Sequence, residues 1–208
     1  LVGSEMCIRD RVIDSKAFSL FKPDALKEKA QKYMFILEDA KSNPAGIQKS
    51  ANKEYIFARR HDESLAPIGK NITKTNLINM VWVSRKFANM YLCQNGLPVT
   101  YNNGTNPQFK GYATLASEWE NRDNRMRYTL AKPGDTFWDN SSKGCRLTWN
   151  DASDQNHAVH TDFIPRSGTG YHNQKWASER EVKDNFEGYD YPIIRYAEVL
   201  LNYAEAVY

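Results

Sequence analysis

The sequence predicts a mainly α-helical fold that carries an irregular, loop-rich lobe and a few short strands. Three segments space their apolar residues by three and four positions, which is the period of one helix face. A short aromatic segment alternates in the manner of a strand. Between Leu97 and Tyr189, turn-forming residues interrupt the chain every few positions, which is typical of loops.

The predicted elements follow in chain order. A helix begins at Pro23-Asp24 and runs roughly to Lys41, with Leu26, Ala30, Tyr33, Met34 and Leu37 on one face. Residues 54–59 are expected to form a short strand, and residues 76–93 a second helix that stops at Gln94-Asn95-Gly96. We expect a short helix at residues 118–127 and one or two short strands within residues 163–176.

The last predicted helix covers residues 192–208. Pro192 fits the first turn of a helix, and one apolar face follows it, formed by Ile193, Ala197, Leu200, Ala204 and Val207. Tyr196-Ala197-Glu198 recurs seven positions later as Tyr203-Ala204-Glu205. Large aromatic residues beside alanines are a tetratricopeptide-like trait, but any tightly packed amphipathic helix could show the same pattern. The periodicity alone leaves both interpretations open.

Both ends of the chain indicate a fragment. Residues 1–11, LVGSEMCIRDR, resemble a translated sequencing adapter, so we expect the native domain to begin at residue 12. At the other end the helical pattern stops at Tyr208 without a cap or a glycine. We therefore expect that the natural chain continues in both directions.

Composition and charge exclude several classes of protein. Aromatic residues make up 12% of the 208 residues, which excludes a disordered chain, and no apolar stretch approaches the length of about 18 that a membrane span needs. The net charge is +3 with the two signs interspersed, so we expect no nucleic-acid partner. Cys7, Cys93 and Cys145 lack metal-site spacing, and we expect no metal and no cofactor.

Four segments carry a family resemblance. The run YPIIRYAEVLLNYAEA at residues 191–206 closely resembles the signature helix of the SusD/RagB family of outer-membrane nutrient-binding lipoproteins. Upstream, in the family's order, lie a Gly-Leu-Pro element at Cys93 to Pro98 and an Asn-Arg-Asp-x-Arg element at Asn121 to Arg125. The stretch EYIFARR, Glu54 to Arg60, is similar to a family strand. The resemblance covers roughly residues 14–208.

The resemblance implies a partial SusD-like domain at residues 12–208, with a loop-rich lobe at about 97–189 and the signature helix at 192–208. Its fold would be a tetratricopeptide-like helical scaffold that carries the lobe. Such proteins sit on the cell surface at the outer membrane, held by a lipid anchor that is missing from this sequence. They capture glycan oligosaccharides, or sometimes peptides, and hand them to a TonB-dependent transporter barrel without catalysis. Some members bind calcium, for which residues 150–154 offer oxygen atoms.

Aromatic residues in the lobe are the candidate ligand contacts. The apolar face of a sugar ring stacks on flat aromatic rings, while neighbouring polar groups bond its hydroxyls. The best candidates for stacking are Trp138 and Trp149, followed by Tyr171, with Asp139 and Asn150 as polar partners. Alternatively, each ring packs inside the lobe.

Catalysis has little support in the sequence. A glycosidase needs two carboxylates that flank one bond, whereas the acids at Glu118, Glu120 and Asp123 fit a solvated face. We expect Asn121 to Asp123 to cap a helix and pair locally. Arg195, Glu198 and Glu205 are expected to form helix-face or inter-helix pairs. Glycan capture is therefore the first hypothesis. A helical-repeat module for protein partners is the second, and a glycan-processing enzyme is the third.

Overall fold

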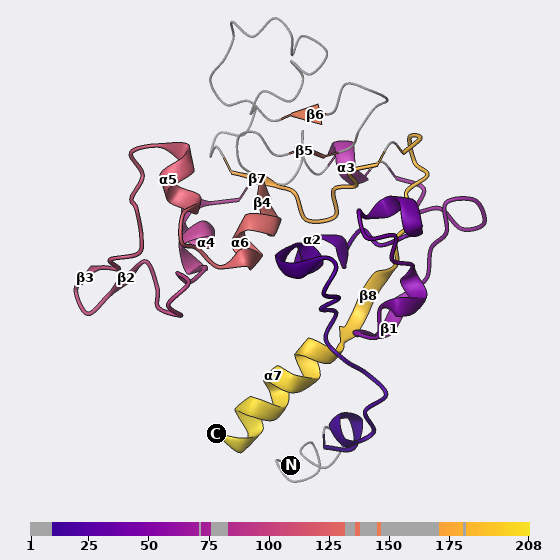
Figure 1. Cartoon of the computed structure of the whole chain (residues 1–208), viewed down its shortest axis with the longest axis horizontal. Coiled ribbons are helices and arrows are strands. Elements are labelled where there is room, and N and C mark those ends of the chain that lie inside the picture. The colour runs from indigo at the N-terminus through magenta and orange to yellow at the C-terminus, as the bar shows by residue number, and fades with distance from the viewer. Residues whose placement is uncertain are drawn as a thin grey trace, which may run out of the picture. The chain divides into compact units, whose positions relative to one another are not determined.

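The computed structural model describes residues 10–70, 72–75, 83–131, 136–137, 145–146, 171–180 and 182–208. The chain divides into two compact units (Figure 1). The first contains Leu1–Ile68 and Gly188–Tyr208, and the second contains Gly69–Glu187. The described part is rich in helices and has a few short strands, as expected. None of its helices combines the length and the apolar character needed to cross a lipid bilayer.

The first unit begins with short helical pieces. They are η1 (Lys27–Lys29), α2 (Ala30–Tyr33), η2 (Ala40–Ser42) and η3 (Lys49–Ala51). The prediction of one helix from Pro23 to Lys41 was wrong. The four residues after Tyr33, Met34 to Leu37, are all buried, and four consecutive positions cannot lie on one face of a helix. A helix with a single apolar face could not bury all four side chains, and α2 ends at Tyr33.

A two-stranded antiparallel sheet joins the two parts of the first unit. Strand β1 (Tyr55–Arg59), which the sequence predicted, pairs with β8 (Tyr191–Arg195). The register places Tyr55 opposite Arg195 and Arg59 opposite Tyr191, with irregularities between them. Figure 1 shows the two strands side by side, with β8 leading directly into the long helix α7 (Tyr196–Val207).

The predicted start of the last helix was wrong, because Pro192 lies in β8 and not in a helical turn. Proline cannot donate to a strand partner, but each strand of a two-stranded sheet is an edge strand and tolerates it. The strand ends where Tyr196 N donates to the carbonyl of Glu54 at 2.8 Å. Pairing with β1 therefore decides that the helix starts four residues later than Pro192.

The second unit is built from short elements around a small core. Its helices are α3 (Ile72–Thr75), α4 (Arg85–Met90), α5 (Leu115–Trp119) and α6 (Asn124–Thr129). Its strands pair as β2 (Thr100–Tyr101) with β3 (Gly104–Thr105), β4 (Leu130–Ala131) with β7 (His172–Asn173), and β5 (Thr136–Phe137) with β6 (Cys145–Arg146). The core cluster contains Ala88, Trp119, Met126, Leu130 and Tyr171.

Two predicted helices of the second unit differ in the structure. The single helix expected at residues 118–127 was wrong, because Asn121 adopts a left-handed backbone (φ 55°) that separates α5 from α6. Asp123 then caps α6 by accepting a hydrogen bond from Arg125 N, which confirms the predicted cap. Of the helix expected at residues 76–93, α4 begins after the cap residue Ser84, and residues 76–82 lie outside the described part.

Candidate functional site

Four of the five predicted ligand contacts, Trp138, Asp139, Trp149 and Asn150, lie outside the described residues. Their ligand roles stay predictions.

Tyr171, the fifth predicted contact, lies in the core of the second unit, with 4% of its surface exposed. Its ring packs on Trp119 at a centroid distance of 6.1 Å. Its hydroxyl donates to Glu118 Oε1 and accepts a hydrogen bond from Arg85 Nε at 3.2 Å. Burial, together with the hydrogen bond to Glu118, raises the pKa of Tyr171 to about 12, so the phenol is a neutral donor at physiological pH. Its contact with a ligand stays a prediction.

Beside it, Arg122 bonds to the backbone. Its guanidinium is buried and donates to the carbonyl oxygens of Ala88 at 2.8 Å and Tyr91 at 2.9 Å, and to that of Glu118 at 3.3 Å. Burial lowers the pKa of Arg122. Through its three carbonyl acceptors, the side chain joins α4 to α5. The Asn-Arg-Asp element is thus structural, as the sequence indicated.

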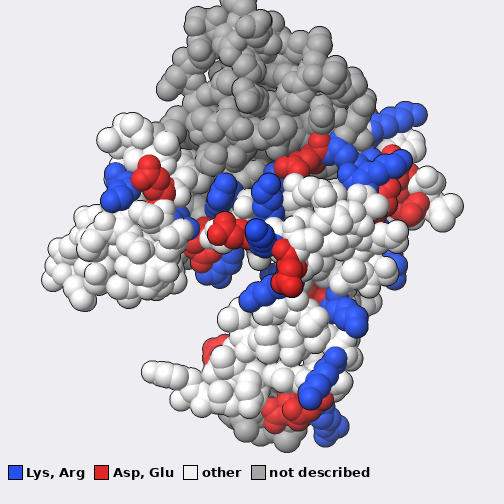
Figure 2. All heavy atoms as spheres, viewed as in Figure 1, with Lys and Arg blue, Asp and Glu red and all other residues white. Residues whose placement is uncertain are grey.

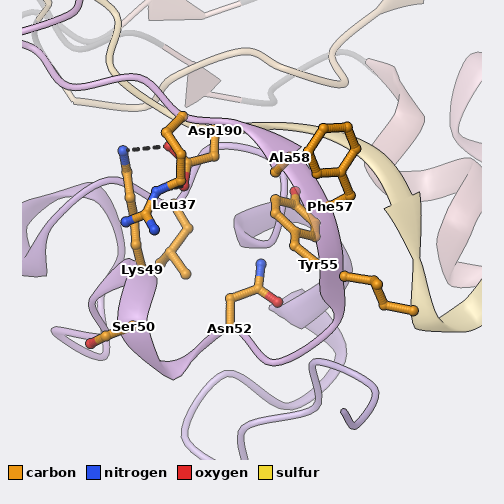
Figure 3. A pocket seen from close by; sticks show the side chains of 10 residues that line it. Leu37, Lys49, Ser50, Asn52, Tyr55, Phe57, Ala58 and Asp190 are labelled. Atoms are coloured by element: carbon orange, nitrogen blue, oxygen red, sulfur yellow. Dashed lines mark hydrogen bonds and ion pairs between the residues drawn. The ribbon is translucent and has the colours of Figure 1, made fainter. Parts of the chain in front are cut away.

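The first unit contains a cavity of about 350 Å³ beside β1, which no sequence prediction named. Its wall includes Leu37, Asn52, Tyr55 and Phe57, and the Lys49–Asp190 pair closes one side (Figure 3). Phe57 is 57% exposed, whereas Tyr55 is half-buried and donates its hydroxyl to Met34 O at 2.8 Å. Burial raises the pKa of Tyr55 far above its ordinary value, so the hydroxyl keeps its proton.

Lys49 holds that side of the cavity in place. Its Nζ donates to Asp190 Oδ1 at 2.9 Å and to the carbonyl oxygens of His61 and Gly188, both at 2.5 Å. The ammonium group has three N–H donors, so all of them are used. Asp190 Oδ1 also accepts from His61 N at 2.9 Å. Lys49 is therefore part of the wall and is not a free cation.

A second cavity of about 400 Å³ shares Lys49 and Arg60 with the first. Its lining carries more acids than bases, with Glu38, Asp39, Asp62 and Glu63 against Lys49 and Arg60. The backbone N–H groups of Leu65 and Ser64 bond the carboxylate of Asp62 and lower its pKa. A carboxyl group that acts as a general acid needs a raised pKa, whereas the pKa of Asp62 is lowered.

The first cavity offers groups that could contact a small molecule. It combines an exposed aromatic ring with polar and charged side chains. Within the described residues, no group of three or more His, Cys, Asp or Glu side chains could hold a metal ion. On the face drawn in Figure 2, acidic and basic side chains lie beside one another and form no patch of one sign.

The sequence carried only part of the signal for this cavity. Phe57 and Arg60 belong to the strand segment that the sequence singled out, and an aromatic residue in a strand that faces solvent was the available clue. Lys49 and Asp190 lie 141 positions apart, and neither stands in a motif. Only the fold brings them together.

Comparison with solved structures shows the same fold in two proteins of Bacteroides fragilis NCTC 9343. One is a SusD-like carbohydrate binding protein, with a TM-score of 0.65 and 19% identity, and the other is a SusD-like protein, with a TM-score of 0.58 and 20% identity. The alignments cover 99% and 97% of this chain but only 36% and 38% of those chains, so the chain spans little more than a third of their length. At these identities the likeness concerns the fold.

Among curated proteins, none matches the chain significantly. The sequence model of the SusD family, in contrast, matches residues 41–208, which is well over half of the chain and includes β1, β8 and α7. This match confirms the resemblance that the signature segments carry. The chain therefore belongs to the SusD family.

Proposed function

We propose that the protein binds glycan oligomers at the outer membrane surface and delivers them, unaltered, to a TonB-dependent transporter. The observation that carries this proposal is the family match over residues 41–208. A solved structure of the same fold, from Bacteroides fragilis, is a SusD-like carbohydrate binding protein. We also propose that the protein is a surface lipoprotein, held by a lipid anchor that lies outside this sequence. The native domain would begin at residue 12.

The proposed ligand contacts in the lobe at about 97–189 are the rings of Trp138, Trp149 and Tyr171. A pyranose ring has one apolar face, and an aromatic side chain covers that face with little loss of conformational entropy. Asp139 and Asn150 would bond the hydroxyl groups beside the rings. This assignment is supported by the family match and by residue chemistry.

The absence of catalysis is part of the proposal. Glu118, which bonds the predicted ligand contact Tyr171, accepts a hydrogen bond from its hydroxyl and is buried. A carboxylate engaged in this way supports the core of the second unit. It is not placed to protonate a glycosidic oxygen in solvent.

We further propose that α7 belongs to a tetratricopeptide-like helix pair. The heptad spacing of Ala197 and Ala204 supports this arrangement, because small residues on one face let a neighbouring helix approach closely. Leu201 and Val207 on α7 are exposed, with Leu201 at 71%. Large exposed apolar side chains support a further packing partner for the helix.

The test measures the binding of maltohexaose, xylohexaose, mannohexaose and laminarihexaose to the purified chain. Tryptophan fluorescence and calorimetry are the two methods of detection. We expect saturable binding of at least one oligosaccharide without release of shorter products. Trp138→Ala and Trp149→Ala should weaken it by about tenfold, since stacking aromatic groups contribute of order 1 kcal/mol or more. Phe87→Ala, at an exposed aromatic in α4, is the control.

A protein-interaction module is the second candidate, and the exposed apolar side chains of β8 and α7 favour it. In that case no oligosaccharide would change the fluorescence of the chain. Leu201→Ser would abolish copurification of a protein partner from solubilised outer membranes. Copurification of a TonB-dependent transporter that survives Leu201→Ser, together with glycan binding, would favour the first proposal.

A further inference from the structure

We propose that the cavity beside β1 in the first unit binds a single neutral sugar residue, stacked on Phe57 and bonded by Asn52. The inference rests on the proposed glycan function but concerns a different site. The lobe residues Trp138, Trp149 and Tyr171 belong to the second unit. All residues that line the cavity belong to the first unit.

Phe57 supplies the stacking surface. It lies in β1, where it stands opposite Ile194 of β8, between two irregularities of the strand register. More than half of its surface is exposed, although burial of a phenylalanine side chain stabilises a fold. An exposed ring at the edge of a cavity offers a surface for the apolar face of a sugar.

Asn52 supplies a hydrogen-bond donor. Its Oδ1 accepts from Glu54 N at 3.0 Å, which orients the amide group. In the described part of the chain, its Nδ2 has no hydrogen-bond partner. Figure 3 shows the Asn52 side chain rising into the space between Leu37 and Tyr55. An oriented amide nitrogen without a partner is placed to donate to a sugar hydroxyl.

The surrounding charges favour a neutral ligand. The lining of the cavity itself has two bases, Lys49 and Arg60, and one acid, Asp190, which pairs with Lys49 and whose Oδ2 lies 3.5 Å from Arg60 Nε. In the adjoining cavity, four acidic residues stand against the same two bases. An anionic saccharide would meet a net negative lining there, whereas the hydroxyls of a neutral sugar can donate to carboxylates.

The volume is sufficient for one sugar residue. Sites for small molecules range from about 300 to 1,000 Å³, and this cavity of about 350 Å³ is at the lower end. An oligosaccharide would therefore place one residue in the cavity and extend the others into solvent.

The experiment titrates the whole chain, labelled selectively at phenylalanine, with the four neutral hexasaccharides and with oligogalacturonate. The amide resonance of Phe57, identified by its loss in Phe57→Leu, should shift saturably with a neutral oligosaccharide and not with oligogalacturonate. Phe57→Leu removes the aromatic face but keeps an apolar side chain, and should weaken the interaction, measured for this variant by calorimetry, by about three- to tenfold. Phe87→Leu, at an exposed ring in α4, should change nothing.

A second variant tests the amide. Asn52→Ser keeps a side-chain oxygen that can accept from Glu54 N, removes the Nδ2 donor and adds no charge, so the local turn is retained. We expect a loss of about three- to tenfold for one hydrogen bond of about 1 kcal/mol. Ser19→Ala, at an exposed position of the first unit outside the cavity, is the control.

The outcomes separate the two proposals. If oligosaccharides bind and Trp149→Ala weakens binding while Phe57 does not shift, the cavity proposal is overturned and the lobe site stands. If Phe57 shifts and neither tryptophan variant has an effect, the cavity proposal stands without the lobe site. A shift with oligogalacturonate alone overturns the neutral-ligand assignment, and no binding of any saccharide overturns both proposals.

Discussion

The carboxylate of Glu54 and the guanidinium of Arg195 form an ion pair at 3.0 Å, across 141 positions of sequence. The other carboxylate oxygen of Glu54 accepts from Phe21 N at 2.8 Å, and its carbonyl accepts from Tyr196 N. Arg195 also lies over the ring of Phe35. Glu54 therefore connects Phe21, β1 and the beginning of α7 in the first unit.

Glu54→Ala should destabilise the first unit strongly. The variant leaves Arg195 without its anion and Phe21 N without an acceptor, and breaking a buried pair in this way costs about 3–5 kcal/mol. Chemical denaturation measures the change. Arg125→Ala, which breaks the exposed pair with Asp123, should cost no more than about 1 kcal/mol. Equal losses in the two variants would contradict the assigned role of Glu54.

Gly188→Ala should also destabilise the first unit. A Cβ atom at Gly188 would lie 2.4 Å from Glu63 N and 3.0 Å from the backbone carbon of Asp62, so the backbone must move. Overpacking of this kind costs about 1–3 kcal/mol. Thermal melting measures the loss, with Gly104→Ala as the control because its nearest atom lies at 3.9 Å. An unchanged melting temperature for Gly188→Ala would refute the close approach.

Arg122→Lys should destabilise the second unit although it keeps the charge. One guanidinium reaches carbonyl oxygens on Ala88, Tyr91 and Glu118, and the compact ammonium of lysine lacks this fork. Acceptors left buried without a donor cost about 1–3 kcal/mol each. Arg125→Lys, at an exposed position, should be nearly neutral. Denaturation curves that coincide for the two variants would contradict this role.

Tyr171→Phe should cost about 1–3 kcal/mol, because Glu118 then loses the hydroxyl donor that is buried with it. Tyr112→Phe removes an exposed hydroxyl that donates to Asn89 and should cost about 0.5 kcal/mol or less. The same pair of variants examines ligand contact. Because phenylalanine keeps the aromatic ring, a stacking contact predicts unchanged glycan affinity in Tyr171→Phe at a temperature where the variant is fully folded.

Stability should depend on pH through Glu187. Burial raises the pKa of its carboxyl above the ordinary value of 4.5, although Thr73 and Ile72 N donate to it. The folded state thus binds the proton more tightly than the unfolded state, and this contribution is present below pH 4.5 and lost as the pH rises through the raised pKa. The free energy of unfolding of the unaltered chain, minus that of Glu187→Gln, should therefore fall as the pH rises through the raised pKa. If the two free energies change in parallel with pH, the raised pKa of Glu187 is contradicted.

Local patterns in the sequence were sufficient for some elements and insufficient for others. The alternation of residues 54–59 predicted β1, and the polar pattern at Asp123 predicted a helix cap. Both features depend on neighbours within a few positions. The helix expected over Pro23 to Lys41 failed because burial of Met34 to Leu37 on all sides is a tertiary requirement that periodicity does not contain.

The sequence by itself determined the family of this protein, since the segments at residues 54–60, 93–98, 121–125 and 191–206 carry its signature in order. The tertiary structure alone decided that Pro192 lies in a strand and that Tyr171 is a core residue. It also decided that Lys49, Phe57 and Asp190 share one cavity. The physical reason is that signatures and caps are local, whereas strand pairing, burial and cavity walls depend on contacts between residues far apart in the chain.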